Sequence, residues 1–310
     1  MATALSRPRV VLAVCTFNRN EELAVLLECV ASIAERNARA FAIGAVVVDD
    51  SADAKARAVA EKFAKRFELG THYRHSGARN ISVARNMALE TAMELGDWIA
   101  MTDDDCEPGE DWLSELLRVQ RETGADVVTG PLFRRAHAGA PAWISDQPFL
   151  NASRFDAADG ARLHTAFTNN CLIASAILRH DPKLRFRPEF GRIGGEDTVF
   201  FHGIADAGHT MHFARHAVMF ENEVEERLTL SYQLRRFFWY GNTSVQTSRA
   251  KGVGAARLAK HGVGTIVRAL GRPIGRVLRG ERPHMLYALA EVCNGAGKLA
   301  GVMGVKVNHK

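Results

Sequence analysis

Short apolar runs alternate with helix-spaced apolar positions over the first hundred residues of the chain. Four runs of the kind typical of strands buried on both faces lie at residues 9–15, 43–48, 71–74 and 98–102. After the first run, Leu23, Leu27 and Val30 belong to an apolar series with the spacing of one helix face. Further helices are expected over residues 53–67 and from Gly77 onwards. Strands that alternate with helices predict an α/β fold built on a parallel sheet with right-handed crossovers.

The pattern is less regular in the following part of the chain. A helix is expected over residues 111–122, and strands over residues 126–129 and 168–173. Residues 132–164 show no clear period and are rich in Arg, Ala, Pro and Asp. Because a long irregular segment inside a compact domain is usually functional or mobile, we interpret it as an insertion that contacts the substrate.

The composition is that of a globular protein able to bury a large core, with 310 residues of which 47% are hydrophobic. The five cysteines show no C-x-x-C spacing, which indicates reduced thiols and excludes a disulfide framework or a zinc site. No apolar run approaches the ~20 residues of a membrane span, and residues 10–15 are too few for the apolar core of a signal peptide. We therefore expect a cytoplasmic protein without a membrane-spanning helix.

The net charge of +5 is distributed unevenly. Residues 249–310 contain 12 Lys/Arg and 2 Asp/Glu, a net charge of +10, whereas residues 1–248 contain 28 and 33, a net charge of −5. An acidic main domain with a basic tail favours contact between the tail and an anionic surface, either a membrane or a nucleic acid.

Polar residues follow the expected strands at the ends where ligands bind in parallel α/β sheets. They are Thr16, Asn18 and Arg19 after the first strand, Asp50 and Ser51 after the second, and Asp103, Asp104 and Asp105 after the fourth. The G-x-G-x-x-G fingerprint of dinucleotide-binding proteins and the G-x-x-x-x-G-K-[ST] loop of nucleoside triphosphatases are both absent from the sequence. A nucleotide bridged by a metal ion to the acidic triplet remains compatible with this pattern.

Two acidic groups carry the candidate chemistry. Three adjacent carboxylates repel one another, so the triplet predicts a cation such as Mg²⁺ or Mn²⁺, ions that commonly carry a diphosphate. The alternative is an acidic turn that caps the helix beginning near Asp111. Glu196 and Asp197 follow Gly194 and Gly195, which fits a tight loop beside a ligand, with an ordinary helix start as the alternative.

Five motifs taken together resemble the glycosyltransferase family 2 enzymes with a GT-A fold, and they occur in the order of that family. They are TFNR at residues 16–19, DDS at 49–51, ARN at 84–86, TDDD at 102–105 and GGEDT at 194–198. The resemblance spans about residues 9–220, roughly two-thirds of the chain. It is strongest to the bacterial exopolysaccharide members, such as the glucosyltransferases of succinoglycan assembly. It implies a Rossmann-like, mostly parallel sheet flanked by helices, here with a basic helical C-terminal extension.

The resemblance also implies roles for individual residues. Asp197, next to Glu196, corresponds to the general base, and Asp105 and Asp103 correspond to the D-x-D pair that holds Mn²⁺ or Mg²⁺. Because all three triplet positions are Asp, the register of this pair can shift by one residue and give Asp104 either role. The donor nucleotide would be bound by Thr16, Phe17, Asn18, Arg19, Asp50, Ser51, Arg85, Asn86, Asp103 and Asp104.

The implied activity is inverting, metal-dependent transfer of a hexose from a UDP-sugar to a saccharide acceptor. Glucose is the hexose that the resemblance favours. The acceptor would be carried on a lipid and serve bacterial surface polysaccharide synthesis. A nucleotidyltransferase would also use an acidic pair and Mg²⁺, but TFNR stands where its glycine-rich, lysine-bearing loop is expected. An inactive nucleotide-sugar-binding scaffold is the non-enzymatic alternative, against which the intact acidic groups argue.

The chain is expected to divide into a catalytic domain at residues 1–225, with its donor half at 1–130 and its acceptor half at 131–225, and a helical region at 226–310. In that region, apolar residues between Val263 and Leu278 fall on one side of a helix, with arginines on the opposite side and Pro273 as an expected kink. A helix of this kind favours a peripheral location on the inner membrane face. The alternative is a helix docked on the catalytic domain. Nucleic-acid binding is not expected, because the tail has few aromatic residues for stacking.

Overall fold

The computed structural model describes residues 7–150 and 157–308, and the chain forms two compact units. The first unit comprises Met1–Phe133, Ser153–Gly191 and Glu196–Glu221. The second unit comprises Arg134–Ala152, Arg192–Gly195 and Asn222–Lys310. The described residues 134–150 therefore group with the C-terminal helices, although they lie far from them in the sequence.

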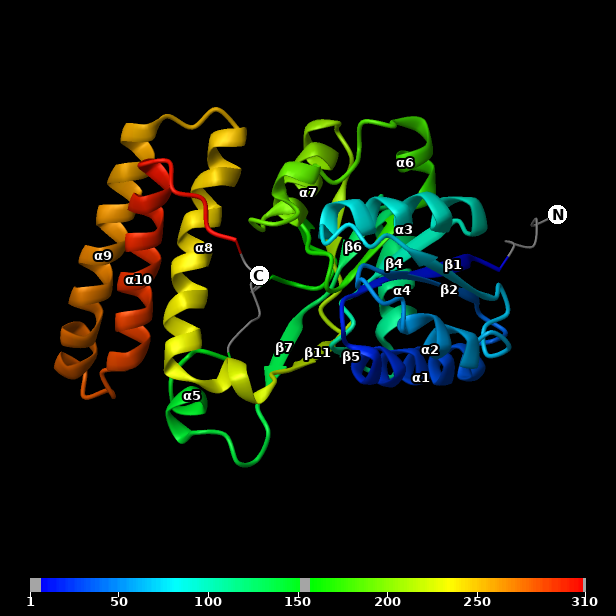
Figure 1. Cartoon of the computed structure of the whole chain (residues 1–310), viewed down its shortest axis with the longest axis horizontal. Helices are drawn as coiled ribbons and strands as arrows, with labels where there is room; N and C mark the ends of the chain where they lie inside the picture. The colour runs from blue at the N-terminus through cyan, green and yellow to red at the C-terminus, as the bar shows by residue number, and fades with distance from the viewer. Residues whose placement is uncertain (1–6, 151–156, 309–310) are drawn as a thin grey trace. The chain divides into compact units, whose positions relative to one another are not determined.

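An eight-stranded sheet forms the centre of the first unit, with the strand order β3-β2-β1-β4-β9-β6-β10-β8 (Figure 1). Its strands are β1 Arg9–Thr16, β2 Ala42–Asp49, β3 Thr71–His75, β4 Trp98–Met101, β6 Val127–Thr129, β8 Arg162–Leu163, β9 Cys171–Ala174 and β10 Met211–Phe213. In the part of the sheet with the order β3-β2-β1-β4, each strand runs parallel to the next. Strand β9 runs antiparallel to both β4 and β6. The expected mostly parallel α/β sheet is thus confirmed.

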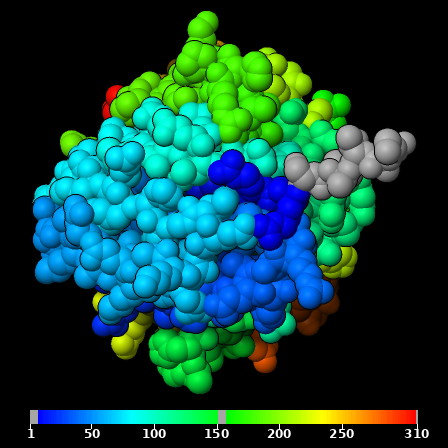
Figure 2. Space-filling view, turned by 90° about the vertical axis from the view of Figure 1, so that its right-hand side faces the viewer, coloured from blue at the N-terminus to red at the C-terminus, as the bar shows by residue number. Residues whose placement is uncertain are grey.

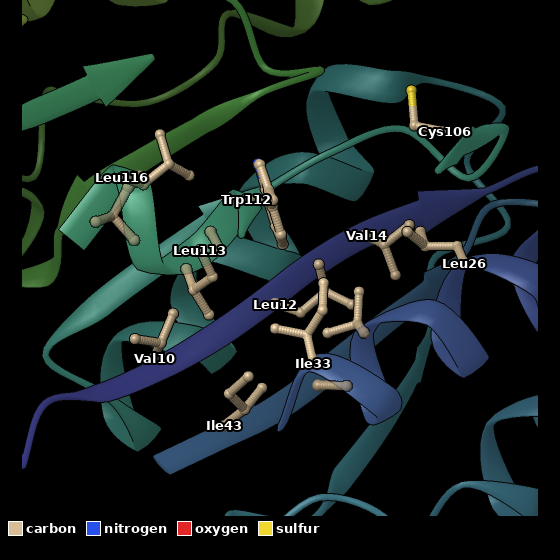
Figure 3. Packing of buried hydrophobic residues seen from close by; sticks show 14 of the residues in the cluster. Val10, Leu12, Val14, Leu26, Ile33, Ile43, Cys106, Trp112, Leu113 and Leu116 are labelled. Carbon is tan, nitrogen blue, oxygen red and sulfur yellow. The ribbon is translucent and has the colours of Figure 1, made fainter. Parts of the chain in front are cut away.

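Helices cover both faces of this sheet because the strand side chains alternate between two hydrophobic cores. Val10, Leu12 and Val14 of β1 pack in one core with residues of α1, α2 and α4 (Figure 3), whereas Val11 and Ala13 pack in the other with residues of α3, α6 and α7. These helices are α1 Asn20–Arg36, α2 Ala56–Lys62, α3 Ile81–Leu95, α4 Trp112–Thr123, α6 Ser175–His180 and α7 Glu196–Asp206. Figure 2 shows the face on which the N-terminal third of the chain, blue to cyan, makes up most of the surface.

The segment at residues 132–164 contains more regular structure than the sequence predicted. It holds β7 (Leu132–Arg135), the short helix α5 (Ala142–Asp146) and β8, so the expectation of a segment without clear elements is wrong there. Strand β7 belongs to a three-stranded sheet of order β5-β11-β7, in which β5 is Cys106–Pro108 and β11 is Met219–Asn222. Residues 151–156, including Phe155, lie outside the described residues.

The second unit is built on the helices α8 (Leu230–Ala250), α9 (Ala255–Leu278) and α10 (Met285–Val302). Its core holds Phe149, whose ring meets those of Phe237 and Tyr287 edge to face at centroid distances of 5.9 and 5.3 Å. The expected amphipathic helix is confirmed and continues through Pro273. Within residues 7–150 and 157–308, no helix is both long enough and apolar enough to cross a membrane.

Candidate active site

Three parallel strands end at the same edge of the sheet, and this edge carries the candidate site. Thr16, the last residue of β1, pairs with Asp49, the last residue of β2. On the other side of β1, Met101 at the end of β4 pairs with Ala13, three residues before Thr16. The chain that leaves β4 therefore reaches the level of Thr16 at Asp104, which brings the acidic triplet beside the loop after β1.

Asp104 is the buried centre of the triplet, with only 4% of its surface exposed. Its Oδ2 accepts a hydrogen bond from the Thr16 hydroxyl at 2.8 Å, and its Oδ1 accepts one from Arg19 Nη1 at 3.0 Å. Burial raises the pKa of Asp104, and the Arg19 charge and the Thr16 hydrogen bond only partly offset this effect. Since its two carboxylate oxygens accept hydrogen bonds from Thr16 and Arg19, Asp104 holds the loop after β1 in place.

Arg19 is the positive charge that pairs with Asp104 and Asp105. The same Nη1 atom that contacts Asp104 donates to Asp105 Oδ2 at 2.8 Å, so one guanidinium nitrogen bridges two carboxylates. The preceding residue, Asn18, has a φ of 56°, a left-handed conformation that Asn tolerates better than most residues. Burial alone would lower the pKa of Arg19, but the charges of Asp105 and Asp104 outweigh it and raise that pKa.

Arg85 of α3 connects the triplet to the second acidic group. Its Nη2 donates to Asp103 Oδ1 at 3.0 Å, and its Nη1 donates to Glu196 Oε1. The Asp103 side chain is 41% exposed, compared with 6% and 8% for those of Asp104 and Asp105. Of the three carboxylates, Asp103 is therefore the one most accessible to a ligand from solvent.

Helix α3 is fixed at its start by an asparagine that sequence reasoning missed. The Asn80 side chain accepts hydrogen bonds from the backbone N–H groups of Ser82 at 3.1 Å and Val83 at 3.3 Å, as an N-cap residue does. Its own amide donates to the carbonyl oxygen of Pro188 at 3.0 Å, which ties the helix start to the chain that leads towards α7. An Asn directly before an apolar helical series is the signal that could have found this residue.

Glu196 and Asp197 form the first turn of α7 and have different environments. Gly194 and Gly195 precede them with φ values of 77° and 85°, which favour glycine. Glu196 is buried against Arg85; burial raises its pKa, and the Arg85 charge opposes this shift. Asp197 is half-buried, and its Oδ1 accepts a hydrogen bond from the Thr198 N–H at 2.6 Å. The pair thus consists of a buried anchor and a more accessible carboxylate.

The residues after β2 are held in place by hydrogen bonds within the first unit. Asp50 is 2% exposed, and its oxygens accept hydrogen bonds from the Asn80 N–H at 2.8 Å and from the Ser76 hydroxyl. The Ser51 hydroxyl donates to Asp49, whose other oxygen accepts from the Ala56 N–H at 3.1 Å. Contacts of Asp50 and Ser51 with a nucleotide stay predictions, while their visible role is to shape the loop.

The structure does not bring every predicted site residue into the carboxylate cluster. Asn86 exchanges two hydrogen bonds of 2.8 Å with the main chain of Phe186, so its amide is used to position a neighbouring segment. Phe17 is half-buried in the loop after β1. The cluster itself consists of Thr16, Arg19, Arg85, Asp103, Asp104, Asp105 and Glu196, with Asp197 next to it in the chain.

The donor atoms of the triplet fit a hard divalent cation. Among residues 7–150 and 157–308, no group of three or more His, Cys, Asp or Glu side chains is placed to hold a metal ion by itself. Mg²⁺ is usually bound through only one or two carboxylates, with water and substrate phosphates as its other ligands. The carboxylates of Asp103 and Asp105 at the sheet edge supply such a pair, with Arg85 and Arg19 as their present partners.

Comparisons with known proteins agree with this geometry. The family model "Glycosyl transferase family 2" matches residues 12–180. The succinoglycan biosynthesis protein ExoM of Rhizobium meliloti is 35% identical over 238 residues, which cover 75% of this chain and 72% of that protein.

Solved structures show the same fold at low sequence identity. The mannosyltransferase PcManGT of Pyrobaculum calidifontis, in complex with GDP-Man and Mn²⁺, has a TM-score of 0.64 at 17% identity over 97% of this chain and 89% of that one. S. aureus TarS has a TM-score of 0.53 at 14% identity over 94% of this chain, which spans 55% of the TarS chain. S. aureus TarS 1-349 in complex with UDP has a TM-score of 0.50 at 14% identity over 96% of this chain and 92% of that one. The family model covers more than half of the chain, and we conclude that the chain belongs to glycosyltransferase family 2 and has a GT-A fold.

Proposed function

We propose that this chain is an inverting, metal-dependent glycosyltransferase that moves a hexose from a UDP-sugar to a saccharide acceptor. Glucose is the preferred donor sugar, and the acceptor is carried on a lipid at the inner face of the cell membrane for bacterial surface polysaccharide synthesis. The observation that carries the proposal is the convergence of Asp103, Asp105, Arg85 and Glu196 at the carboxyl edge of three parallel strands, with Asp197 beside them.

The similar proteins support the choice of substrates. The 35% identical relative is named for succinoglycan biosynthesis, which suggests the same class of product. TarS 1-349 has been solved with UDP and with UDP-GlcNAc, and PcManGT with GDP-Man and Mn²⁺. A nucleotide-sugar donor with a divalent ion therefore fits the carboxylate edge of this chain.

The residues of the triplet would stabilise the departing nucleoside diphosphate. Asp103 and Asp105 would hold Mn²⁺ or Mg²⁺, and the bound ion supplies Lewis-acid stabilisation of the negative charge on the leaving group. Asp104 would keep the two ligands in place through its bonds to Thr16 and Arg19. The guanidinium group of Arg19 adds positive charge to the same side of the site.

Asp197 would act as the general base of the transfer. A carboxylate within hydrogen-bond reach of the acceptor hydroxyl accepts its proton as the oxygen attacks the anomeric carbon. One in-line displacement inverts that carbon, so an α-linked nucleotide sugar yields a β-glycoside. Glu196, bound to Arg85, fixes the first turn of α7 and thereby the position of Asp197.

The substitution Asp197→Asn tests this assignment. Loss of a general base lowers kcat by about 10²–10⁴-fold, whereas donor affinity measured by calorimetry is expected to stay unchanged. Asp206→Asn is the matched control, because Asp206 is an exposed acid at the other end of the same helix. Loss of donor binding in Asp197→Asn would place Asp197 in the donor site, and full turnover would remove it from the reaction.

A further inference from the structure

Asp105, a proposed ligand of the metal ion, is already paired with a cation of the chain. The Arg19 Nη1 atom donates a hydrogen bond of 2.8 Å to Asp105 Oδ2 and one of 3.0 Å to Asp104 Oδ1. The two carboxylate side chains are only 8% and 6% exposed, so they meet this guanidinium group in a partly desolvated environment. Two cations on one carboxylate group repel each other. Arg19 and a metal ion therefore compete for Asp105.

Arg19 is less firmly held than Arg85, the other arginine of the cluster. The Arg85 side chain is only 9% exposed and lies between Asp103, which follows β4, and Glu196 of α7. The Arg19 side chain is 35% exposed, and the two carboxylates that it contacts both belong to the triplet. Arg19 precedes α1 as its N-cap residue, but its side chain makes no capping hydrogen bond. Because only Arg85 is fixed between two elements, Arg19 is the arginine able to leave its carboxylate.

The charge of the cluster favours such an exchange when an anionic nucleotide binds. Among the described residues, the cluster contains five carboxylates and two guanidinium groups, which leaves three formal negative charges. The acids are Asp103, Asp104, Asp105, Glu196 and Asp197, and the bases are Arg19 and Arg85. A diphosphate is repelled by this charge unless a cation enters with it or a guanidinium group turns towards it. A guanidinium group has five N–H donors, so Arg19 is able to reach a further acceptor with atoms other than Nη1.

We propose that Arg19 pairs with Asp105 until a nucleoside diphosphate binds, and then releases Asp105 to the metal ion and donates to the diphosphate. Contacts of arginine with phosphate are among the strong charge-assisted hydrogen bonds. Binding of the metal ion alone breaks the Arg19–Asp105 pair without replacing it, whereas joint binding of metal ion and nucleotide replaces it. Arg19 therefore adds to the positive coupling between the two ligands. The inference rests on the proposed transfer reaction and gives Arg19 a positioning role within it.

Two binding measurements on the full chain test the proposal. Binding of Mn²⁺ alone is followed by the electron paramagnetic resonance signal of free Mn²⁺, and binding of UDP at saturating Mn²⁺ is followed by calorimetry. The substitution Arg19→Gln is expected to tighten binding of Mn²⁺ alone at least ~10-fold, because a charge-assisted hydrogen bond no longer competes for Asp105. The same substitution is expected to weaken binding of UDP at least ~10-fold, because the diphosphate loses its guanidinium partner.

Arg66→Gln is the matched control. Arg66 also bridges two carboxylates, those of Glu28 and Glu35, and its side chain is 33% exposed, but it lies outside the cluster. Neither affinity is expected to change in this variant. Arg19→Lys keeps a positive charge beside the buried carboxylates and replaces Arg19→Gln if that variant loses the native circular dichroism. Its ammonium group lacks the planar fork of donors that binds phosphate bidentately, so the same two changes are expected at a smaller size.

A salt series separates direct pairing from long-range effects of charge. At about 1 M KCl, where the screening length is about 3 Å, both changes are expected to persist, because Arg19 and Asp105 are in contact. Loss of both changes there would overturn the proposal. Equal or weaker binding of Mn²⁺ alone by the Arg19→Gln variant would overturn it as well and make Arg19 a fixed support of the triplet. Absence of Mn²⁺-dependent UDP binding by the native chain would instead overturn the proposed function, and the role of Arg19 with it.

Discussion

Arg85 is the residue on which the geometry of the candidate site depends most. The substitution Arg85→Met keeps a long apolar side chain but removes the cation between Glu196 and Asp103. Glu196 is 8% exposed, and removing one partner of a buried ion pair costs about 3–5 kcal/mol because the other charge stays buried. Asp103 is 41% exposed, so solvent screens its charge, and the loss of its ion pair with Arg85 costs less than about 1 kcal/mol more. We expect the free energy of unfolding to fall by about 3–6 kcal/mol in total.

This loss should depend on pH in a defined direction. Burial raises the pKa of Glu196, and Arg85 opposes the shift, so the pKa rises further when Arg85 is absent. A carboxylate whose pKa is higher in the folded than in the unfolded state binds more protons when folded. Stability then falls as pH rises from the unfolded pKa of about 4.3 to the folded pKa. The deficit of Arg85→Met is therefore expected to be largest at neutral pH and to shrink as pH falls towards about 4.3.

Urea unfolding followed by circular dichroism measures both effects. The double variant Arg85→Met/Glu196→Gln removes the unpaired charge and is expected to recover most of the lost free energy. Arg39→Met, at an exposed arginine, is the control and is expected to change stability by less than about 0.5 kcal/mol. A deficit below about 1 kcal/mol in Arg85→Met, or no recovery in the double variant, would refute the buried ion pair as the support of α7.

Two further substitutions probe the supports of the site. Asn80→Ala removes the N-cap of α3 and is expected to lower the free energy of unfolding by about 1 kcal/mol, measured by urea unfolding, with Asn80→Ser retaining most of it; equal stability of Asn80→Ala would exclude this capping role. Asp105→Asn is expected to weaken Mn²⁺-dependent binding of UDP in calorimetry at least ~10-fold, as loss of a ligand charge implies, while Asp111→Asn leaves it unchanged; unaltered affinity would move the metal to other residues of the triplet.

The strands that build the site edge were predictable from the sequence because they are buried on both faces. Each of β1, β2 and β4 consists of a continuous apolar run, and the polar residues that follow each run mark its carboxyl end. The direction of β9 was not predictable in this way. Its run at Cys171–Ala174 fits either orientation, and the pairing with β4 and β6 that makes it antiparallel depends on the path of the whole chain.

Helix and loop boundaries followed the sequence less closely. Helix α2 spans Ala56–Lys62, whereas a helix was expected from the sequence over residues 53–67. Phe63 and Phe67 are buried all the same, because residues 63–67 form turns that keep both rings in the core. Burial with helical spacing therefore does not require a continuous helix.

The polar network of the site depends on contacts that no local pattern encodes. Arg85 meets Glu196, a residue 111 positions away, and Asp50 is engaged by Ser76 and by the backbone of Asn80. The acidic triplet itself was visible from the sequence, but its division into a buried Asp104 and a more accessible Asp103 follows from the register of β4 against β1. Contact of residues 132–164 with an acceptor stays a prediction.

The release of nucleoside diphosphate tests the central claim most directly. The full chain is incubated with UDP-, GDP- and TDP-sugars in the presence of Mn²⁺, Mg²⁺ or EDTA, and the nucleoside diphosphate set free is quantified. The account predicts slow release from one UDP-sugar, which EDTA abolishes and Mn²⁺ or Mg²⁺ restores. Absence of release from every donor, together with absence of metal-dependent UDP binding in calorimetry, would contradict it and leave the acidic triplet as a structural turn.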